Sequence, residues 1–148
     1  MPIVRSFDRS MIESCLRTNQ MKFLRDNDGD FRVEFGFDDE MGCELTISLA
    51  AAGQQHDIFS MLIFTDKRIP NWDWNRVIQV CNEWNDTRRW PKAYLHVRDT
   101  SDSTAGILLE QSIDLEHGIH QELFDDLTMT TMVNAFAFWK WAHGEKNI

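Results

Sequence analysis

The sequence has few cysteines and no long apolar run, and each absence excludes a class of protein. Its 3 cysteines are Cys15, Cys43 and Cys81, which lie far apart within apolar patterns. An odd number of separated cysteines predicts free thiols in a reducing compartment, and therefore a cytoplasmic location. The apolar stretches are far shorter than the ~20 residues that span a bilayer, and Met1 to Arg17 has no signal-peptide core. We expect neither export nor membrane anchoring.

Motifs that carry catalytic chemistry are also missing. The sequence contains no Gly-rich phosphate loop, no His-Glu-x-x-His and no Gly-x-Ser-x-Gly. A cysteine nucleophile is disfavoured because each cysteine occupies an apolar periodic position, where burial raises the thiol pKa and makes the thiol inert. We therefore predict a protein that is not an enzyme and that needs no cofactor.

Two polar segments invite a metal-binding interpretation. The run from Asp26 to Asp30 is rich in carboxylates, but with Gly29 as the sixth residue of a calcium loop the twelfth would be Phe35, which is no ligand. His117 and His120 have no cysteine pair beside them, and their spacing does not place both rings on one helical face. A hairpin turn and a solvated loop, in which Gly118 has an unusual φ, are the preferred interpretations. A metal site remains the least favoured alternative.

The charge balance disfavours two kinds of partner. The chain carries 24 acidic and 15 basic residues, for a formal net charge of -9. Such a charge repels phosphate backbones and anionic lipid surfaces. We expect no nucleic acid and no membrane among the partners.

The order of hydrophobic periods predicts an α+β fold in a single domain that spans residues 1–148. Apolar residues repeat with a helical period at the start, the middle and the end of the chain, and with a period of two between these segments. The predicted helices cover 7–19, 73–88 and 119–143, and the predicted strands cover 21–25, 31–37, 43–49 and 58–65, followed by a hairpin around Leu95 and 107–115. The order is therefore α-β-β-β-β-α-β-β-α. Ser6 or Asp8 could cap the first helix and Asn71 the second.

The last predicted helix has apolar residues on two sides. Met132 and Trp139 fall on one side, whereas Leu127 and Trp141 fall roughly opposite. Either the helix breaks near Thr128 to Thr131, where three threonines lower the helix propensity, or it is buried on two sides.

Aromatic residues and one strand supply the candidate binding surface. The chain has 6 tryptophans and 10 phenylalanines, which is more aromatic surface than one small core encloses comfortably. The strand from Ile58 to Thr65 is apolar on both faces. The predicted peptide or dimer surface comprises Phe59, Met61, Ile63, Trp72, Phe138 and Trp141.

The segment Asn82-Glu83-Trp84-Asn85, followed by Arg88, Arg89 and Lys92-Ala93-Tyr94, resembles the YbjN family of small bacterial proteins. The turn Asp28-Gly29-Asp30 and the run from Ile113 to Ile119 also fit, so the resemblance covers approximately Ser6 to Trp139. Asn82, Trp84, Asn85 and Arg89 are the family-motif residues, and we interpret them as structural. The chain departs from the family pattern by its extra tryptophans, Trp72, Trp90 and Trp141.

The resemblance implies a fold similar to that of type III secretion chaperones, in which helices flank an antiparallel sheet. Such proteins are often dimeric, and peptide binding is proposed for them. No catalytic residue is implied. The first hypothesis is therefore a non-enzymatic, homodimeric domain, chaperone-like or regulatory, that holds apolar segments of a partner protein. The alternative is a structural or regulatory homodimer that has no peptide client.

Overall fold

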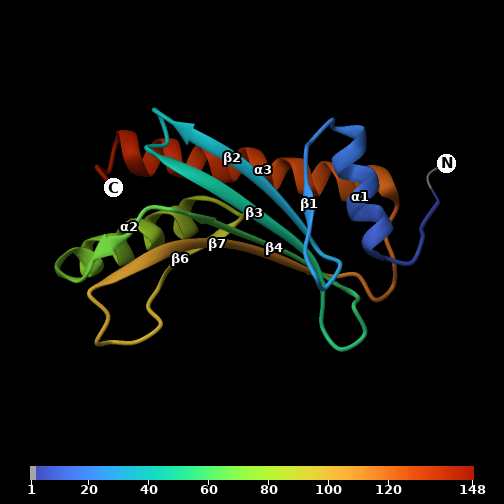
Figure 1. Cartoon of the computed structure of the whole chain (residues 1–148), viewed down its shortest axis with the longest axis horizontal. Coiled ribbons are helices and arrows are strands. Elements are labelled where there is room, and N and C mark those ends of the chain that lie inside the picture. The colour runs from blue at the N-terminus through green and yellow to red at the C-terminus, as the bar shows by residue number, and fades with distance from the viewer. Residues whose placement is uncertain (1–2) are drawn as a thin grey trace.

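The computed structural model describes residues 3–148 and arranges the predicted elements around one sheet (Figure 1). The predicted order is confirmed, with a two-residue strand and a 3-10 turn added before the second helix. In chain order the elements are α1 (Arg9–Thr18), β1 (Leu24–Arg25), β2 (Phe31–Asp38), β3 (Cys43–Ala52), β4 (Ile58–Thr65), β5 (Ile69–Pro70), η1 (Asn71–Asp73), α2 (Trp74–Thr87), β6 (Lys92–His96), β7 (Thr104–Asp114) and α3 (Gln121–Gly144).

The sheet has seven strands within the described residues, and every pairing is antiparallel. Its main path runs β1-β2-β3-β4-β7, and β6 and β5 also pair with β7. The predicted α+β class is therefore confirmed. Because β7 is 11 residues long, its second half lies beside β4 while its first half lies beside β5, and β6 pairs along its other edge.

All three helices contact the same face of the sheet. Phe7, just before α1, packs against Phe59 of β4 with ring centroids 5.8 Å apart, and Phe59 packs against Phe124 of α3 at 4.6 Å. Trp84 of α2 meets Phe138 of α3 at 5.2 Å. Figure 1 shows α3 running behind the strands along the length of the sheet. The opposite face, which we call the open face, has none of these helices on it.

The period of two places one side chain of each strand in the core. Val33, Ile47, Ile63, Leu109 and Ala93 lie next to one another across β2, β3, β4, β7 and β6, and each is at most 3% exposed. Their neighbours in sequence point to the open face. The hydrophobic core thus lies between the sheet and the three helices.

Helix α3 continues without interruption through its threonines. The Thr128 hydroxyl donates to the carbonyl oxygen of Phe124 at 2.8 Å, and the Thr131 hydroxyl donates to that of Leu127 at 2.8 Å. Both hydroxyls are therefore satisfied inside the helix and can be buried. Of the two alternatives that the sequence left open, the break near these residues does not occur, because tertiary burial outweighs the lower helix propensity of threonine.

Of the two predicted N-caps, the one for α1 is confirmed and the one for α2 is wrong. The Asp8 carboxylate accepts a hydrogen bond from Ser10 N at 2.9 Å and caps α1, as expected for a residue with extended backbone before a helix. Asn71 does not cap α2, because residues 71–73 form the η1 turn and α2 begins after Asp73. Asp73 instead forms an ion pair with Arg76 at 2.8 Å.

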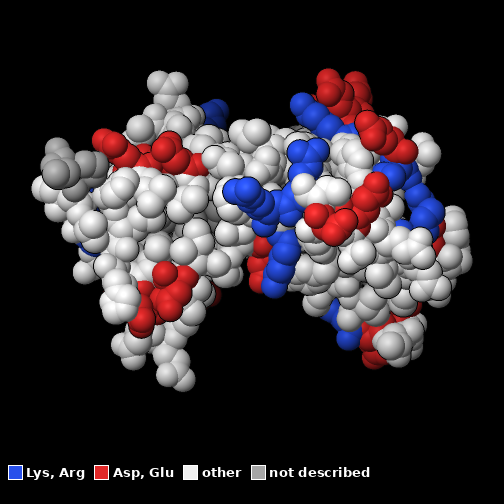
Figure 2. Space-filling view, turned by 180° about the vertical axis from the view of Figure 1, so that it is seen from behind, with Lys and Arg blue, Asp and Glu red and all other residues white. Residues whose placement is uncertain are grey.

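The charges are distributed over the surface without one dominant patch on the side that Figure 2 shows. Basic and acidic side chains are interspersed over one half of that side, and the other half is largely uncharged with small acidic groups. None of the described helices is long and apolar enough to cross a bilayer.

Candidate functional site

Three residues predicted for the binding surface lie in the core instead. Phe59, Met61 and Ile63 of β4 are at most 1% exposed and point toward the helices. Their prediction as surface residues is wrong, because a strand that is apolar on both faces gives no sign of which face the helices cover.

Two large apolar residues near the end of β4, Leu62 and Phe64, point to the open face and are half-buried. Leu62 is paired with Ser48 of β3 and Glu110 of β7, and Phe64 with Thr46 of β3. Leu108 of β7 and Tyr94 of β6, which pair with each other, lie on the same face and are also half-buried. We call these four residues, Leu62, Phe64, Leu108 and Tyr94, the open-face patch.

Polar side chains border this patch on β6 and β7. The Tyr94 hydroxyl donates to Glu110 Oε1 at 3.0 Å, and Lys92 Nζ lies 3.7 Å from Glu110 Oε2. Burial and the bond to Glu110 raise the pKa of Tyr94 from 10.0 to about 12, so the phenol remains a hydrogen-bond donor at neutral pH. The ring of His96 stands 6.4 Å from that of Tyr94. The patch therefore has an apolar centre and a satisfied polar rim.

The other three residues of the predicted surface, all aromatic, lie apart from one another in the structure. Phe138 is fully buried in the core, which corrects its prediction as a surface residue. Trp141 is half-buried, because its ring packs 5.9 Å from that of Trp84 and the Lys146 ammonium lies over its other side at 5.3 Å. Trp72 is 81% exposed on η1. The structure does not bring these residues into one surface.

Two family-motif residues, Trp84 and Asn85, tie α2 to β6. Trp84 Nε1 donates to the carbonyl oxygen of Pro91 at 2.9 Å, and its ring is 1% exposed. The Asn85 amide donates to the carbonyl oxygen of Ala93 at 2.9 Å, and Ala93 N donates back to Asn85 Oδ1 at 2.9 Å. These bonds fix where β6 begins.

Asn82 and Arg89, the remaining motif residues, are exposed, and Arg89 lies beyond the end of α2. Asn85 has the structural role that the sequence predicted, and it bonds a strand instead of the end of its own helix. Its partner Ala93 is eight residues further along the chain, a contact that only the return of the chain along the sheet creates.

Replacing Asn85 with alanine is expected to lower the free energy of unfolding by about 1–3 kcal/mol. The reason is that the peptide N–H and C=O of Ala93 both lose their partner at a half-buried site. Urea unfolding followed by tryptophan fluorescence measures the loss. Asn82→Ala is the matched control, because its side chain makes no hydrogen bond to residues 3–148, and we expect no measurable change. Equal losses in the two variants would contradict the structural role of Asn85.

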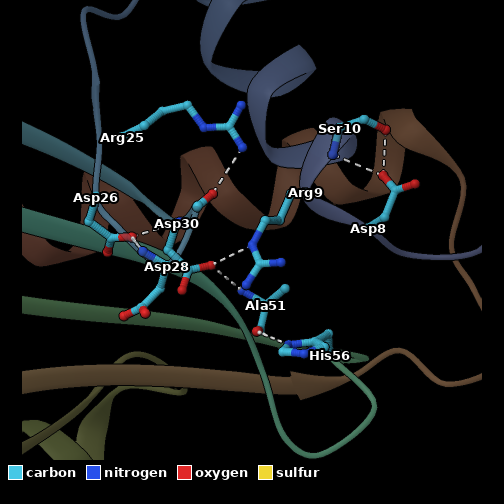
Figure 3. Close-up of polar contacts among 10 residues, drawn as sticks. Asp8, Arg9, Ser10, Arg25, Asp26, Asp28, Asp30, Ala51 and His56 are labelled. Carbon is cyan, nitrogen blue, oxygen red and sulfur yellow. Dashed lines mark hydrogen bonds and ion pairs between the residues drawn. The ribbon is translucent and has the colours of Figure 1, made fainter.

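The acidic run of residues 26–30 forms the predicted hairpin turn (Figure 3). Asp26 Oδ1 accepts the backbone N–H groups of Asp28 and Asp30, both at 2.9 Å. Asp30 Oδ1 accepts from Arg9 Nε at 3.0 Å and from Ala51 N at 3.1 Å, and thereby joins α1 to β3. These carboxylates hold protein groups, as the turn prediction requires.

His117 and His120 have separate surroundings. His120 Nδ1 accepts from Leu123 N at 3.1 Å and caps α3, while His117 is exposed beside Glu116. Gly118 between them has φ +84°, as the sequence predicted. A larger residue would not fit at this position, because its Cβ would lie 2.5 Å from Arg5 O. Asp57, Asp114 and Glu116 have oxygens within 4.8 Å of one another, but exposed acidic residues alone do not define a metal site.

All three cysteines are free and buried. Burial raises the pKa of Cys15 from 9.0 to about 12, and the pKa values of Cys43 and Cys81 to about 11. A thiol with such a pKa stays protonated near neutral pH and is a poor nucleophile.

A family comparison covers most of the chain. The sequence profile of the YbjN family, described as "Putative bacterial sensory transduction regulator", matches residues 8–141. The chain belongs to the YbjN family. This description names a regulator and not an enzyme. The comparison with curated proteins finds no match.

A solved structure of this family has the same fold. The crystal structure of YbjN from E. coli, described as "a putative transcription regulator", superposes with a TM-score of 0.75 at 10% sequence identity, over 97% of each chain. At this identity the likeness shows a common YbjN fold and nothing about ligands.

The residues that sequence reasoning missed are Leu62, Leu108 and Phe64. Each alternates with a core residue; Leu62 and Phe64 belong to the strand predicted to be apolar on both faces, and nothing in the sequence singles out Leu108. The open face and the helical face of β4 can be told apart only in the assembled sheet, where β4 pairs with β7. This pairing joins segments about fifty residues apart in the chain, as in Leu62 with Glu110.

Proposed function

We propose that this protein is a non-enzymatic regulatory domain that binds an apolar segment of a partner protein on the open-face patch. The observation that supports the proposal is that Leu62, Phe64 and Leu108 are half-buried apolar side chains on a sheet face without a helix. Contiguous apolar surface with a polar rim is typical of interaction sites. A cytoplasmic location fits the three free thiols.

The polar rim supports a polypeptide as the partner. Lys92 and Glu110 offer one charge of each sign on β6 and β7, and Arg32 and Glu34 offer another pair at the β2 end of the same face. A surface with both signs at its rim and an apolar centre suits a peptide segment better than it suits a polyanion. We therefore retain the expectation that nucleic acid and membrane are not the partners.

Site-specific photocrosslinking tests this function. Phe64 is replaced by p-benzoylphenylalanine in the full chain, and the protein is irradiated in bacterial cells. We expect a discrete adduct with another protein, identified by mass spectrometry, that disappears when Leu62→Glu is added. The control carries the crosslinker at Val133, which is 60% exposed on the helical side. Identical adducts from both positions, or none from position 64, would contradict the proposal.

The second candidate function is a regulatory homodimer without a client. It is favoured by large apolar side chains that are exposed outside the open-face patch, namely Trp72 at 81% and Phe37 at 63%. In the crosslinking experiment a homodimer through the patch would appear as an adduct of the chain with itself. Light scattering of the wild type and of Trp72→Glu measures self-association elsewhere. Trp141→Glu is unsuitable, because Trp141 packs on Trp84 and its loss would damage the fold.

A further inference from the structure

The outer edge of β6, away from β7, already carries a side chain that imitates a strand. The carboxamide of Asn85 both donates to and accepts from the peptide group of Ala93, each bond being 2.9 Å long. A neighbouring antiparallel strand makes this same pair of bonds with a residue at a sheet edge. Asn85 thus occupies the place of a peptide group from an eighth strand.

The next outward-facing peptide groups on this edge belong to Leu95. In an antiparallel strand both backbone groups of a residue point to the same side, and the side alternates along the strand. The backbone N–H and C=O of Ala93 point outward to Asn85, so the backbone N–H and C=O of Leu95, two residues later, also point outward. Within residues 3–148, neither Leu95 N–H nor Leu95 C=O has a hydrogen-bond partner on that side. An edge with a free donor and acceptor is a template for another extended chain.

A cavity separates this free edge from α2. It has a volume of about 280 Å³ and is lined by Ile78, Cys81, Asn82, Asn85, Ala93, Tyr94 and Leu95. We call it the α2–β6 cleft. Asn82 lies one turn before Asn85 on the same helical face, and its amide makes no hydrogen bond to the described residues. Ile78, one turn earlier, is 51% exposed. The cleft therefore offers an amide on one wall, a free peptide group on the other and an apolar surface beside them.

We infer that the α2–β6 cleft binds an extended peptide by strand addition to β6. The backbone of the peptide bonds Leu95 N–H and C=O, the Asn82 amide bonds its other edge, and one apolar side chain lies on Ile78. Strand addition of this kind takes its affinity from main-chain hydrogen bonds and is tolerant of sequence. The contacts on which the inference rests, at Leu95, Asn82 and Ile78, lie outside the open-face patch, and Tyr94 is the residue that borders both sites.

The occupant is a single extended segment and not a second folded copy of the chain. Helix α2 borders the outer edge of β6, so the cleft has space for one backbone between helix and strand. A strand that belongs to a second folded copy has another strand or a helix packed beside it. Helix α2 would clash with that neighbour. A flexible segment of a partner has no such neighbour.

Titration with a defined peptide, followed by NMR, tests the inference. The probe is acetyl-Thr-Val-Thr-Val-Thr-amide, and its partner probe has the same sequence with N-methyl groups on both valines. We expect the unmethylated peptide to shift the Leu95 backbone amide and the Asn82 side-chain amide, and to slow hydrogen exchange at Leu95. The N-methylated peptide should not bind, because it lacks the donors that strand addition requires.

Two variants in the full-length chain complete the experiment. Asn82→Ala should weaken binding about tenfold, the loss that corresponds to one ordinary hydrogen bond. Gln79→Ala, an exposed amide on α2 outside the cleft, should leave the affinity unchanged.

Three results would overturn the inference: no shift at Leu95, equal binding of the methylated peptide, or shifts confined to Leu62, Phe64 and Leu108, the open-face residues that do not line the cleft. Shifts at Leu95 that depend on protein concentration without peptide would assign the cleft to a second copy and also overturn it. The crosslinking at position 64 tests the open-face patch, and the NMR titration tests the cleft. The failure of one proposal can therefore be distinguished from the failure of the other.

Discussion

Replacing Trp84 with alanine is expected to lower the free energy of unfolding by about 3–5 kcal/mol, the range for truncating a buried aromatic side chain. The ring is 1% exposed, meets Phe138 edge-on at 5.2 Å and packs against Trp141 at 5.9 Å. Its Nε1 also holds the carbonyl oxygen of Pro91. The substitution leaves a cavity beside the Phe138 and Trp141 rings of α3 and removes one of the bonds between α2 and the start of β6.

Urea unfolding followed by circular dichroism measures this loss, and two further variants separate its causes. Trp84→Phe keeps most of the ring and removes the bond to Pro91, so we expect a loss of about 1–2 kcal/mol. Trp72→Ala, at a site 81% exposed, should change stability by less than about 0.5 kcal/mol. If Trp84→Ala were as mild as Trp72→Ala, Trp84 would not be the residue that joins α2, α3 and β6.

Replacing Phe59 with alanine is the second change with a large expected effect, about 3–5 kcal/mol in the free energy of unfolding. Phe59 is 1% exposed and lies between Phe7 and Phe124, with ring centroids at 5.8 Å and 4.6 Å. Leu62→Ala, three residues along the same strand on the open face, removes a half-buried side chain and should cost about 1 kcal/mol. Thermal and urea unfolding of both variants supply the comparison.

The same pair of variants separates stability from binding. Leu62→Ala is expected to weaken the crosslink from position 64 while the protein stays folded, whereas Phe59→Ala is expected to destabilise the protein with its patch intact. Similar losses of stability in the two variants would mean that something covers the open face as well as the helical face. That outcome would remove the observation on which the proposed function rests.

The face of β4 illustrates where sequence reasoning reaches its limit. Ile58 to Thr65 is apolar at nearly every position, so the strand could be predicted from the residues themselves. Its orientation could not, because a shift of one residue exchanges the two faces and leaves the composition unchanged. The contact of Phe59 with Phe124, 65 positions later in the chain, decides the orientation.

Helix α3 shows the same limit for a different reason. Its buried stripe contains the predicted side of Met132 and Trp139 and extends from there toward the other predicted side; it comprises Phe124, Thr128, Thr131, Met132, Ala135, Phe138, Trp139 and Ala142. Small and hydroxylated residues, Thr128, Thr131, Ala135 and Ala142, form half of this stripe. Hydropathy gives such residues little weight, although their hydroxyls bond the preceding turn and their size permits close packing.

The sequence by itself determined the order of elements, the hairpin turn at Asp26 to Asp30, the cap at Asp8 and the family of the fold, because each depends on residues that are neighbours in the chain. Only the tertiary structure decided which face of β4 is open, which tryptophans are buried and that Asn85 bonds Ala93. These features depend on segments that meet across the sheet. The open-face patch and the α2–β6 cleft are both formed by segments that are distant in the chain and adjacent in the fold. Leu62 lies beside Glu110 in the patch, and Asn82 and Leu95 line the cleft together.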